Sequence, residues 1–391
     1  MKFLLGALVS STFSAVVVNG QCPFAGLLRG TNASSTFHQG HPYREGESTS
    51  KNTSDEFSWY RDFYYTFMEP PPEADLHRSL QQSSCGITMQ VPTLPRNKLK
   101  LSSTRQDYND FVLAIYDAFV AEASATQALF TPAGALRMAF HECIPFNQFA
   151  KGRGGCKGDI SLEVTRLFAP NARLVFTFNK ISEMINSGQF GSITFADAVH
   201  IAASVAVQAY GGPKYQVKIG RATDFTNADV CPNPSICWPP PSFPQGQPIT
   251  ALSDFIQQMY KNAGWSNPAQ AVVVSSGAHT FGGNRIAPSF DWTSDPYAFN
   301  NEYHQTIMNW WANGGPSGGG FNFLQGLGLS SNGCPISLFN SDMMLGDPNL
   351  PFQPYTDLYA NNQTAFFHDF AVFMKQCSLK GVSNPSQLVD P

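Results

Sequence analysis

An arginine and a histidine stand four positions apart in the apolar segment 131–146. The apolar periodicity of this segment predicts a helix, on which Arg137 and His141 lie one turn apart on the same face. One interpretation is a salt-bridged surface face with an incidental histidine. The other is a catalytic pair, because a histidine can move a proton and a nearby arginine can stabilise developing negative charge. The two residues alone do not decide between these interpretations.

A second histidine follows another apolar segment, AVVVSSGAHTFG at 271–282. His279 lies at the end of the predicted helix, between Gly277 and Gly282, and these small neighbours leave room for a large, flat group. A lone histidine is more often a core residue than a ligand. A histidine that does bind a metal usually donates its other ring N–H to a carboxylate, and Asp342 is a candidate for that carboxylate.

The elements that must position these residues are helices. Helical periodicity recurs along the chain, whereas convincing alternating strands are scarce, so we predict a mainly α protein. The chain has 391 residues, of which 42% are hydrophobic and 13% charged, and this composition predicts a folded protein with a large core. The net charge of −4 gives no reason to expect binding to nucleic acid or to a membrane. The predicted helices span 108–123, 131–146, 174–185, 195–209, 251–262, 268–275 and 364–374.

The N-terminus has the order of a secretory signal. Lys2 precedes the apolar run 3–18, and Asn19-Gly20 follows it, so we predict a signal peptide at 1–20 and a secreted protein. No later segment is apolar for long enough to span a bilayer. Residues 21–106 are rich in Ser, Thr and Pro and predict an extended arm, followed by a folded domain at 107–380 and a tail at 381–391. Three sequons permit glycosylation: Asn32, Asn52 and Asn362.

An even number of cysteines, eight, in an exported chain predicts disulfides. Two pairs each flank a short loop, which places their members close enough to bridge: Cys143 with Cys156, and Cys231 with Cys237. Elimination then pairs the remaining four, as Cys22 with Cys85 and Cys334 with Cys377.

Several segments together resemble one family. LRMAFHEC at 136–143 is similar to the distal-helix motif of the plant, fungal and bacterial haem peroxidase superfamily, and SSGAHTFG at 275–282 to its proximal-histidine motif. Residues 195–221, LFNSDMMLGDP at 338–348 and YANNQTAFFHDFAVFM at 359–374 resemble further parts of that family, in the same order. The likeness covers about 107–380. It implies a two-lobed fold that holds haem b between a distal lobe, about 107–250, and a proximal lobe, about 251–380.

The resemblance assigns roles around the haem. It makes His141 the group that takes a proton from hydrogen peroxide, Arg137 the group that stabilises the charge as the O–O bond breaks, and Phe140 a wall of the distal pocket. Asn171 stands where the family places an asparagine that orients the distal histidine; the alternative is a helix-start residue. His279 becomes the fifth ligand of haem iron.

On the proximal side the segment 288–303 resembles the intracellular class of the superfamily. Asp342 would accept the N–H of His279, and Trp292 would lie beside that histidine, either bonded to Asp342 as a radical carrier or simply packed under the haem. The resemblance also suggests a proximal cation site for calcium or potassium, weakened because Asn300 stands where an aspartate is usual. Its positions are Thr280, Thr293, Asp295 and Asn300.

The distal calcium site of secreted members is altered in this chain. Its positions hold Glu142, Lys157 and Asp159, and an ammonium group is hard to reconcile with a bound dication. We therefore expect no distal calcium, with Lys157 replacing the ion by pairing with Glu142 or Asp159. The alternative is that all three side chains are solvated. The resemblance also supports the Cys143–Cys156 bond.

Comparison with the family narrows the range of possible reducing substrates. Manganese-oxidising members carry acidic residues at three positions that hold Phe130, Gly134 and Arg285 in this chain, which disfavours manganese(II) as the substrate. Ascorbate-using members carry an arginine where this chain has Pro288, which disfavours ascorbate. We predict a secreted, monomeric haem peroxidase that reduces hydrogen peroxide through a ferryl intermediate and oxidises small phenolic or other aromatic donors. The alternative is a non-catalytic haem-binding protein. A zinc hydrolase is disfavoured, because Pro145 breaks the H-E-x-x-H spacing.

Overall fold

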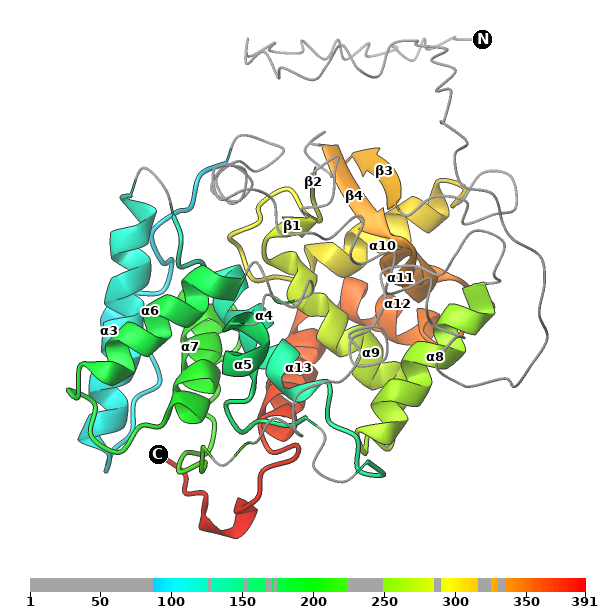
Figure 1. The fold of residues 1–391 in the computed structure, drawn as a ribbon. Coiled ribbons are helices and arrows are strands. Elements are labelled where there is room, and N and C mark those ends of the chain that lie inside the picture. Colours follow the sequence, from blue (N-terminus) through cyan, green and yellow to red (C-terminus); the bar gives the residue numbers. More distant parts are fainter. Residues whose placement is uncertain are drawn as a thin grey trace, which may run out of the picture. The chain divides into compact units, whose positions relative to one another are not determined.

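The computed structural model describes residues 87–125, 128–150, 154–165, 171, 174–223, 225, 249–284, 290–315, 325–329 and 335–391. All of them belong to the second of two units, 51–391. Helices dominate this part of the chain (Figure 1), which confirms the predicted mainly α class. Within these ranges no helix combines the length and the apolar character that crossing a bilayer requires. The predicted signal peptide and five predicted disulfide cysteines lie outside the described residues: Cys22, Cys85, Cys231, Cys237 and Cys334.

Helix α7 is the centre of the first half of the fold. Thr194 caps its start by accepting a hydrogen bond from the backbone N–H of Asp197 (3.1 Å). The helix is rich in alanine and valine, and nearly every side chain is buried, so neighbouring helices pack on several sides of it. In Figure 1, α3 and α6 run beside α7. The helices of this half are α3 (Gln106–Ala123), α4 (Pro132–Cys143), α5 (Ile160–Thr165), α6 (Val175–Asn186) and α7 (Phe195–Ala209).

The second half is built from shorter helices that pack around α9. Asn267 caps α9 by accepting from the N–H of Gln270 (3.2 Å), and Pro268 stands at the first helical position, where its missing N–H does no harm. Helices α8, α12 and α13 pack against α9. The helices of this half are α8 (Ile249–Asn262), α9 (Pro268–Ser276), the 3-10 turn η4 (Gly277–Thr280), α10 (Glu302–Ala312), α11 (Asn340–Met343), the 3-10 turn η5 (Met344–Gly346), α12 (Gln353–Asn361) and α13 (Gln363–Cys377).

A four-stranded sheet, which the sequence did not predict, accompanies these helices. Its order is β1 (Gly283–Asn284), β2 (Phe290–Asp291), β4 (Pro335–Phe339) and β3 (Gln325–Leu329). The β3–β4 pair is antiparallel, with Gln325 opposite Phe339 and Leu329 opposite Pro335, and β2 pairs with β4 in parallel. The sheet leads directly into α11, which carries Asp342, so it positions part of the site.

Both ends of the described chain pack onto the helices. Ahead of α3, Met89 and Leu99 are buried, and the N–H of Leu94 donates to the carbonyl of Ala209 (3.0 Å). At the other end Leu388 is buried, and Val389 pairs with Ile219. The last part of the predicted arm and the predicted tail therefore belong to the same packed body, while the exact domain limits stay a prediction. The sequon residue Asn362 is exposed and caps α13.

Candidate functional site

Helix α4 buries one face in the core and leaves side chains of the other face half-buried. Thr131 caps its start by accepting from the N–H of Gly134 (3.0 Å), and Pro132 fixes the first turn. The face that packs against α7 is buried. On the opposite face Arg137, Phe140 and His141 are only half-buried, although the helix is otherwise interior. The predicted sharing of one face by Arg137 and His141 is confirmed, and this face approaches η4, which carries His279.

A chain of side-chain hydrogen bonds holds the ring of His141. Its Nδ1 lies 2.7 Å from Oδ1 of Asn171, and Nδ2 of Asn171 donates to Oε2 of Glu163 (2.8 Å). Because an amide oxygen can only accept, Nδ1 of His141 carries the proton. Nε2 is then left with its lone pair, the form a base needs. The predicted contact of Asn171 with His141 is confirmed. Its backbone carbonyl also accepts from the N–H of Leu174 (2.8 Å), just before α6.

Electrostatics favour the neutral form of His141. Burial lowers the pKa of His141 well below its usual value, and the charge of Arg137 lowers this pKa further. The imidazole is therefore uncharged at neutral pH and able to accept a proton. Glu163, which anchors this arrangement from α5, was not predicted, because the six-residue helix shows no period of its own.

The residues at the predicted distal calcium position form a buried cluster. Glu142, Lys157 and Asp159 are all buried, so the alternative in which they are solvated is wrong. The backbone N–H of Gly158 donates to Oε1 of Glu142, and Oε2 lies 3.3 Å from Nε2 of His200. Burial raises the pKa of Glu142 to about 8. The pairing of Lys157 with Glu142 or Asp159 stays a prediction.

The predicted Cys143–Cys156 disulfide is present and joins the end of α4 to the loop before α5. The predicted bond between Cys334 and Cys377 is wrong, because Cys377 is a free, buried thiol. It sits at the end of α13, where its carbonyl oxygen lies 2.9 Å from Sγ of Cys156. Burial raises the pKa of the Cys377 thiol to about 12, which keeps it protonated.

Asp342, on α11, accepts four hydrogen bonds around His279. Its Oδ1 lies 2.9 Å from Nδ1 of His279 and accepts from the hydroxyl of Tyr303 (2.7 Å). Its Oδ2 accepts from Nε1 of Trp292 (3.0 Å) and from the backbone N–H of Phe339 (2.8 Å). The predicted contacts of Asp342 with His279 and Trp292 are confirmed. Tyr303 was not predicted; burial and the Asp342 charge raise its pKa well above the usual value, so it stays a donor.

His279 is fixed in orientation by these contacts. Its ring stacks on Trp292 with parallel planes and centroids 4.0 Å apart. Gly277 makes this position possible, because a Cβ there would come within 2.4 Å of the ring of Phe366. The side chain of His279 is 35% exposed whereas Asp342 is 2% exposed, so Nε2 is the ring nitrogen left for a ligand.

The four predicted proximal cation positions also come together. The hydroxyl of Thr280 donates to the carbonyl of Ala298 (3.1 Å) and lies 3.2 Å from Oδ1 of Asn300. The hydroxyl of Thr293 reaches the carbonyls of Thr280 (3.3 Å) and Asp295 (3.2 Å). The grouping is as predicted, and the binding of a cation there stays a prediction.

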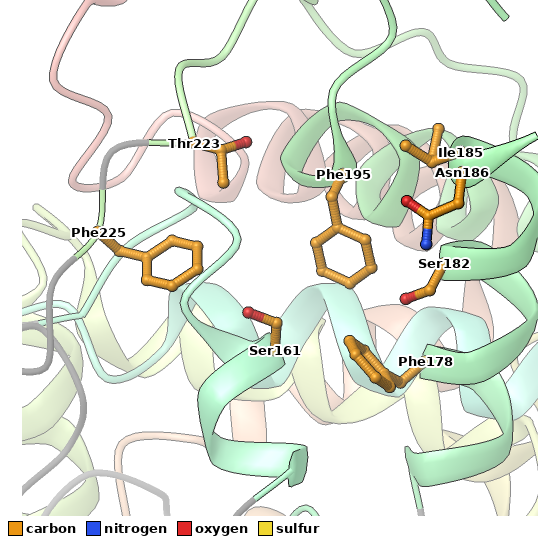
Figure 2. A pocket seen from close by; sticks show the side chains of 8 residues that line it. All are labelled: Ser161, Phe178, Ser182, Ile185, Asn186, Phe195, Thr223 and Phe225. Atoms are coloured by element: carbon orange, nitrogen blue, oxygen red, sulfur yellow. The ribbon is translucent and has the colours of Figure 1, made fainter. Parts of the chain in front are cut away.

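A cavity of about 210 Å³ lies apart from both histidines (Figure 2). In Figure 2 the rings of Phe178, Phe195 and Phe225 surround it. None of Arg137, His141 and His279 lines it. Its lining is uncharged and consists of Ser161, Phe178, Ser182, Ile185, Asn186, Phe195, Thr223 and Phe225.

Comparison with known proteins identifies the family of this chain. A family model described as peroxidase matches residues 116–362, more than half of the chain. The chain belongs to the haem peroxidase superfamily of plants, fungi and bacteria. It is thus a haem-dependent peroxidase, an oxidoreductase that reduces hydrogen peroxide.

Similar peroxidases occur in plants and fungi. "Probable L-ascorbate peroxidase 3, peroxisomal" of Oryza sativa subsp. japonica is 28% identical over 253 residues, covering 64% of this chain and 73% of the relative. A "Putative heme-binding peroxidase" of Mycosarcoma maydis is 29% identical over 192 residues, covering 48% and 54%. "Peroxidase 63" of Arabidopsis thaliana is 24% identical over 302 residues, covering 64% and 76%.

The residues of this peroxidase fit a haem between α4 and η4. His279 has its Nδ1 engaged by Asp342 and its Nε2 left for iron, an arrangement that orients a ligand histidine and raises its basicity. Arg137, Phe140 and His141 lie on the half-buried face of α4, the helix that contacts η4. The donor set therefore fits a haem group: His279 would hold its iron, and Arg137 and His141 would be available for proton transfer and charge stabilisation.

Replacing Asp342 with asparagine is expected to weaken haem binding by roughly 10–100-fold, because the support of the ligand histidine is lost. The amide nitrogen also cannot accept a hydrogen bond, so a buried donor such as Nε1 of Trp292 or the hydroxyl of Tyr303 is left unpaired, which lowers the free energy of unfolding by about 1–3 kcal/mol for each. Haem titration and denaturant unfolding measure the two effects. Asp369→Asn is the matched control, since Asp369 accepts from Gln270 and Tyr359 instead; equal haem affinity in the two variants would contradict this role.

Proposed function

We propose that His141 and Arg137 perform the proton transfer and charge stabilisation of peroxide reduction, and that the electron donors are small neutral aromatic molecules, phenols among them. The observation that carries the first part is the His141–Asn171–Glu163 chain, which leaves Nε2 of His141 as an acceptor. Haem, when bound to His279, supplies the redox chemistry at its iron.

The proposed proton path uses one side chain twice. Nε2 of neutral His141 accepts a proton from hydrogen peroxide and later returns it to the oxygen that leaves as water. Asn171 keeps the ring oriented, because its amide nitrogen is held by Glu163 and cannot turn toward the histidine. Arg137, one turn earlier on α4, stabilises the negative charge on the departing oxygen. Phe140 lies on the same face and excludes water from the space.

The structure at two positions supports donors other than manganese(II). Phe130 is buried and stacks on Phe119 with ring centroids 4.8 Å apart. Gly134 packs against α6, and a Cβ there would come within 2.4 Å of the hydroxyl of Thr177, which leaves no room for a carboxylate. Acidic ligands for manganese are therefore missing at both positions. Arg285 and Pro288 lie outside the described residues.

Ascorbate is the second candidate donor, because several relatives carry the name L-ascorbate peroxidase. A donor comparison separates the classes. With haem-loaded protein and hydrogen peroxide, we expect kcat/KM for a neutral phenol such as guaiacol to exceed that for ascorbate, and manganese(II) to give no turnover. A higher kcat/KM for ascorbate would transfer the proposal to that donor, and manganese(II) turnover would contradict the argument from Phe130 and Gly134.

The proposal places the protein outside the cell. The predicted signal at 1–20 and the Cys143–Cys156 bond support it, since disulfides persist mainly in oxidising compartments. Expression of the full chain in a eukaryotic host is expected to release into the medium a protein whose N-terminus is Gln21, within a residue or two. N-terminal sequencing measures this. Retention in the cell with Met1 intact would contradict it.

A further inference from the structure

The cavity shown in Figure 2 is lined by none of the residues assigned to the peroxide reaction. Helix α6 turns one face to it, because Phe178, Ser182 and Ile185 follow one another at intervals of four and three residues. Phe195, the first residue of α7, and Phe225 complete the aromatic part of the lining. In the view of Figure 2 the ring of Phe225 lies on the left and the rings of Phe178 and Phe195 lie on the right.

The three rings are held in a geometry that suits a further ring. The centroids of Phe178 and Phe195 are 5.6 Å apart with their planes at 69°, an edge-to-face contact. Aromatic rings attract one another in this or an offset geometry at centroid distances of about 4.5–7 Å. Phe195 and Phe225 pack over one backbone position, since a Cβ on Gly158 would lie 3.5 Å and 3.4 Å from them. The lining therefore offers aromatic contacts from three separate segments of the chain.

Polar groups stand between these rings, and none of the described lining residues carries a charge. They are the hydroxyls of Ser161, Ser182 and Thr223 and the amide of Asn186. An ionised ligand would lose water here without meeting an opposite charge, which is costly, whereas a hydroxyl on a ligand can pair with such groups. Asn186 and Thr223 are exposed, so solvent reaches the cavity at their side. The lining thus favours a ligand that is neutral and carries at most a small polar substituent.

We propose that this cavity is a binding site for a small neutral aromatic molecule with a single ring, such as a phenol. Its volume is about 210 Å³. An apolar cavity of about 150 Å³ holds benzene, so one ring fits and room remains for a substituent. Pockets for drug-sized ligands have volumes of about 300–1,000 Å³, so larger ring systems are excluded. Binding at this site involves neither peroxide nor electron transfer.

The test follows the methyl signals of Ile185 by NMR in haem-loaded full-length protein with isotope-labelled isoleucine, and Ile185→Val assigns these signals. Phenol is added at neutral pH without peroxide, so the result does not depend on turnover or on the donors proposed above. A bound aromatic ring shifts the signals of nearby methyl groups through its ring current. We expect the Ile185 signals to move as phenol is added and to reach a limit, which gives the Kd.

Two variants probe the lining from different segments. Ser182→Phe fills the cavity from α6 and is expected to weaken phenol binding by at least about tenfold. Glu183→Phe is the matched control, because it adds the same ring at an exposed neighbour on α6 and is expected to bind as wild type does. Phe225→Leu keeps an apolar side chain but removes one ring, so an affinity loss of about 2–10-fold is expected. Haem content checks that each variant folds, and Phe225→Leu decides alone if Ser182→Phe does not.

A charged analogue tests the class of ligand. 4-Hydroxybenzoate adds a carboxylate to the ring of phenol, and we expect it to bind more weakly than phenol at Ile185. Ile185 signals that phenol leaves in place, or an equal Kd for phenol in wild type and the folded lining variants, would overturn the proposed site. Binding of 4-hydroxybenzoate as tight as that of phenol would overturn the neutral class of its ligand.

Discussion

Replacing His141 with alanine is expected to slow the reaction of the haem-loaded protein with hydrogen peroxide by roughly 10²–10⁴-fold, the contribution of a positioned general acid and base. The variant loses the only imidazole that the structure holds on the half-buried face of α4. Stopped-flow absorption of the haem band under excess peroxide gives the second-order rate constant directly.

Two readouts show that this loss belongs to the proton transfer. The His141→Ala variant is expected to retain full haem content, because His279 and Asp342 lie on other elements. Asn171→Ala is the matched partner: it keeps the histidine but releases the ring, so an intermediate loss is expected. A rate constant for His141→Ala within tenfold of wild type would contradict the assignment.

Replacing Arg137 with leucine is expected to lower the same rate constant by roughly 10²–10³-fold, as the removal of a charge-stabilising donor does. A second effect follows from electrostatics. The charge of Arg137 lowers the pKa of His141, so its removal lets that pKa rise. The neutral base is then lost at a higher pH as the solution is acidified, and the acid limb of the pH profile moves upward.

Arg137→Lys is the control that separates the two effects. It keeps a positive charge near His141, so the acid limb is expected to stay close to that of wild type, while the rate constant at neutral pH falls because the guanidinium fork is lost. Stopped-flow rate constants across the acid range for the three proteins give both quantities. An acid limb that lies at the same pH in Arg137→Leu and wild type would contradict the proposed coupling of Arg137 to His141.

Residues whose function depends on helical spacing or on a long family motif could be predicted from the sequence. Arg137 and His141 follow from one amphipathic helix, and the resemblance placed Asp342 and Trp292 beside His279. Glu163 could not be predicted, because it acts through Asn171 from a six-residue helix.

Tyr303 illustrates a second limit. It lies on α10, where buried polar side chains such as His304 interrupt the apolar period, so neither the helix nor its contact with Asp342 is visible in the sequence. The sheet is hidden for a related reason. Strand β3 contains two glycines in five residues, which weaken any strand pattern, and its pairing with β4 is formed only in the folded chain.

The cysteines show the limit of pairing by count. Cys143 and Cys156 flank one loop, and the structure joins them. Elimination assumed that every cysteine has a partner, and Cys377 does not follow that rule: it ends α13 as a buried thiol. A small apolar position suits a reduced cysteine as well as a disulfide, so an even number of cysteines cannot distinguish a free thiol from a bonded one.

The most direct test of the proposed mechanism is the pH dependence of the reaction between the purified haem-loaded protein and hydrogen peroxide, followed in the haem absorption band. Because the folded pKa of His141 is lowered, the neutral base persists below the usual histidine range. We predict a rapid change of the band whose rate constant stays level as pH falls through about 6.5, the unperturbed histidine value, and decreases only at lower pH. A band that peroxide leaves unchanged at every pH would contradict the mechanism and indicate a protein that holds haem without catalysis.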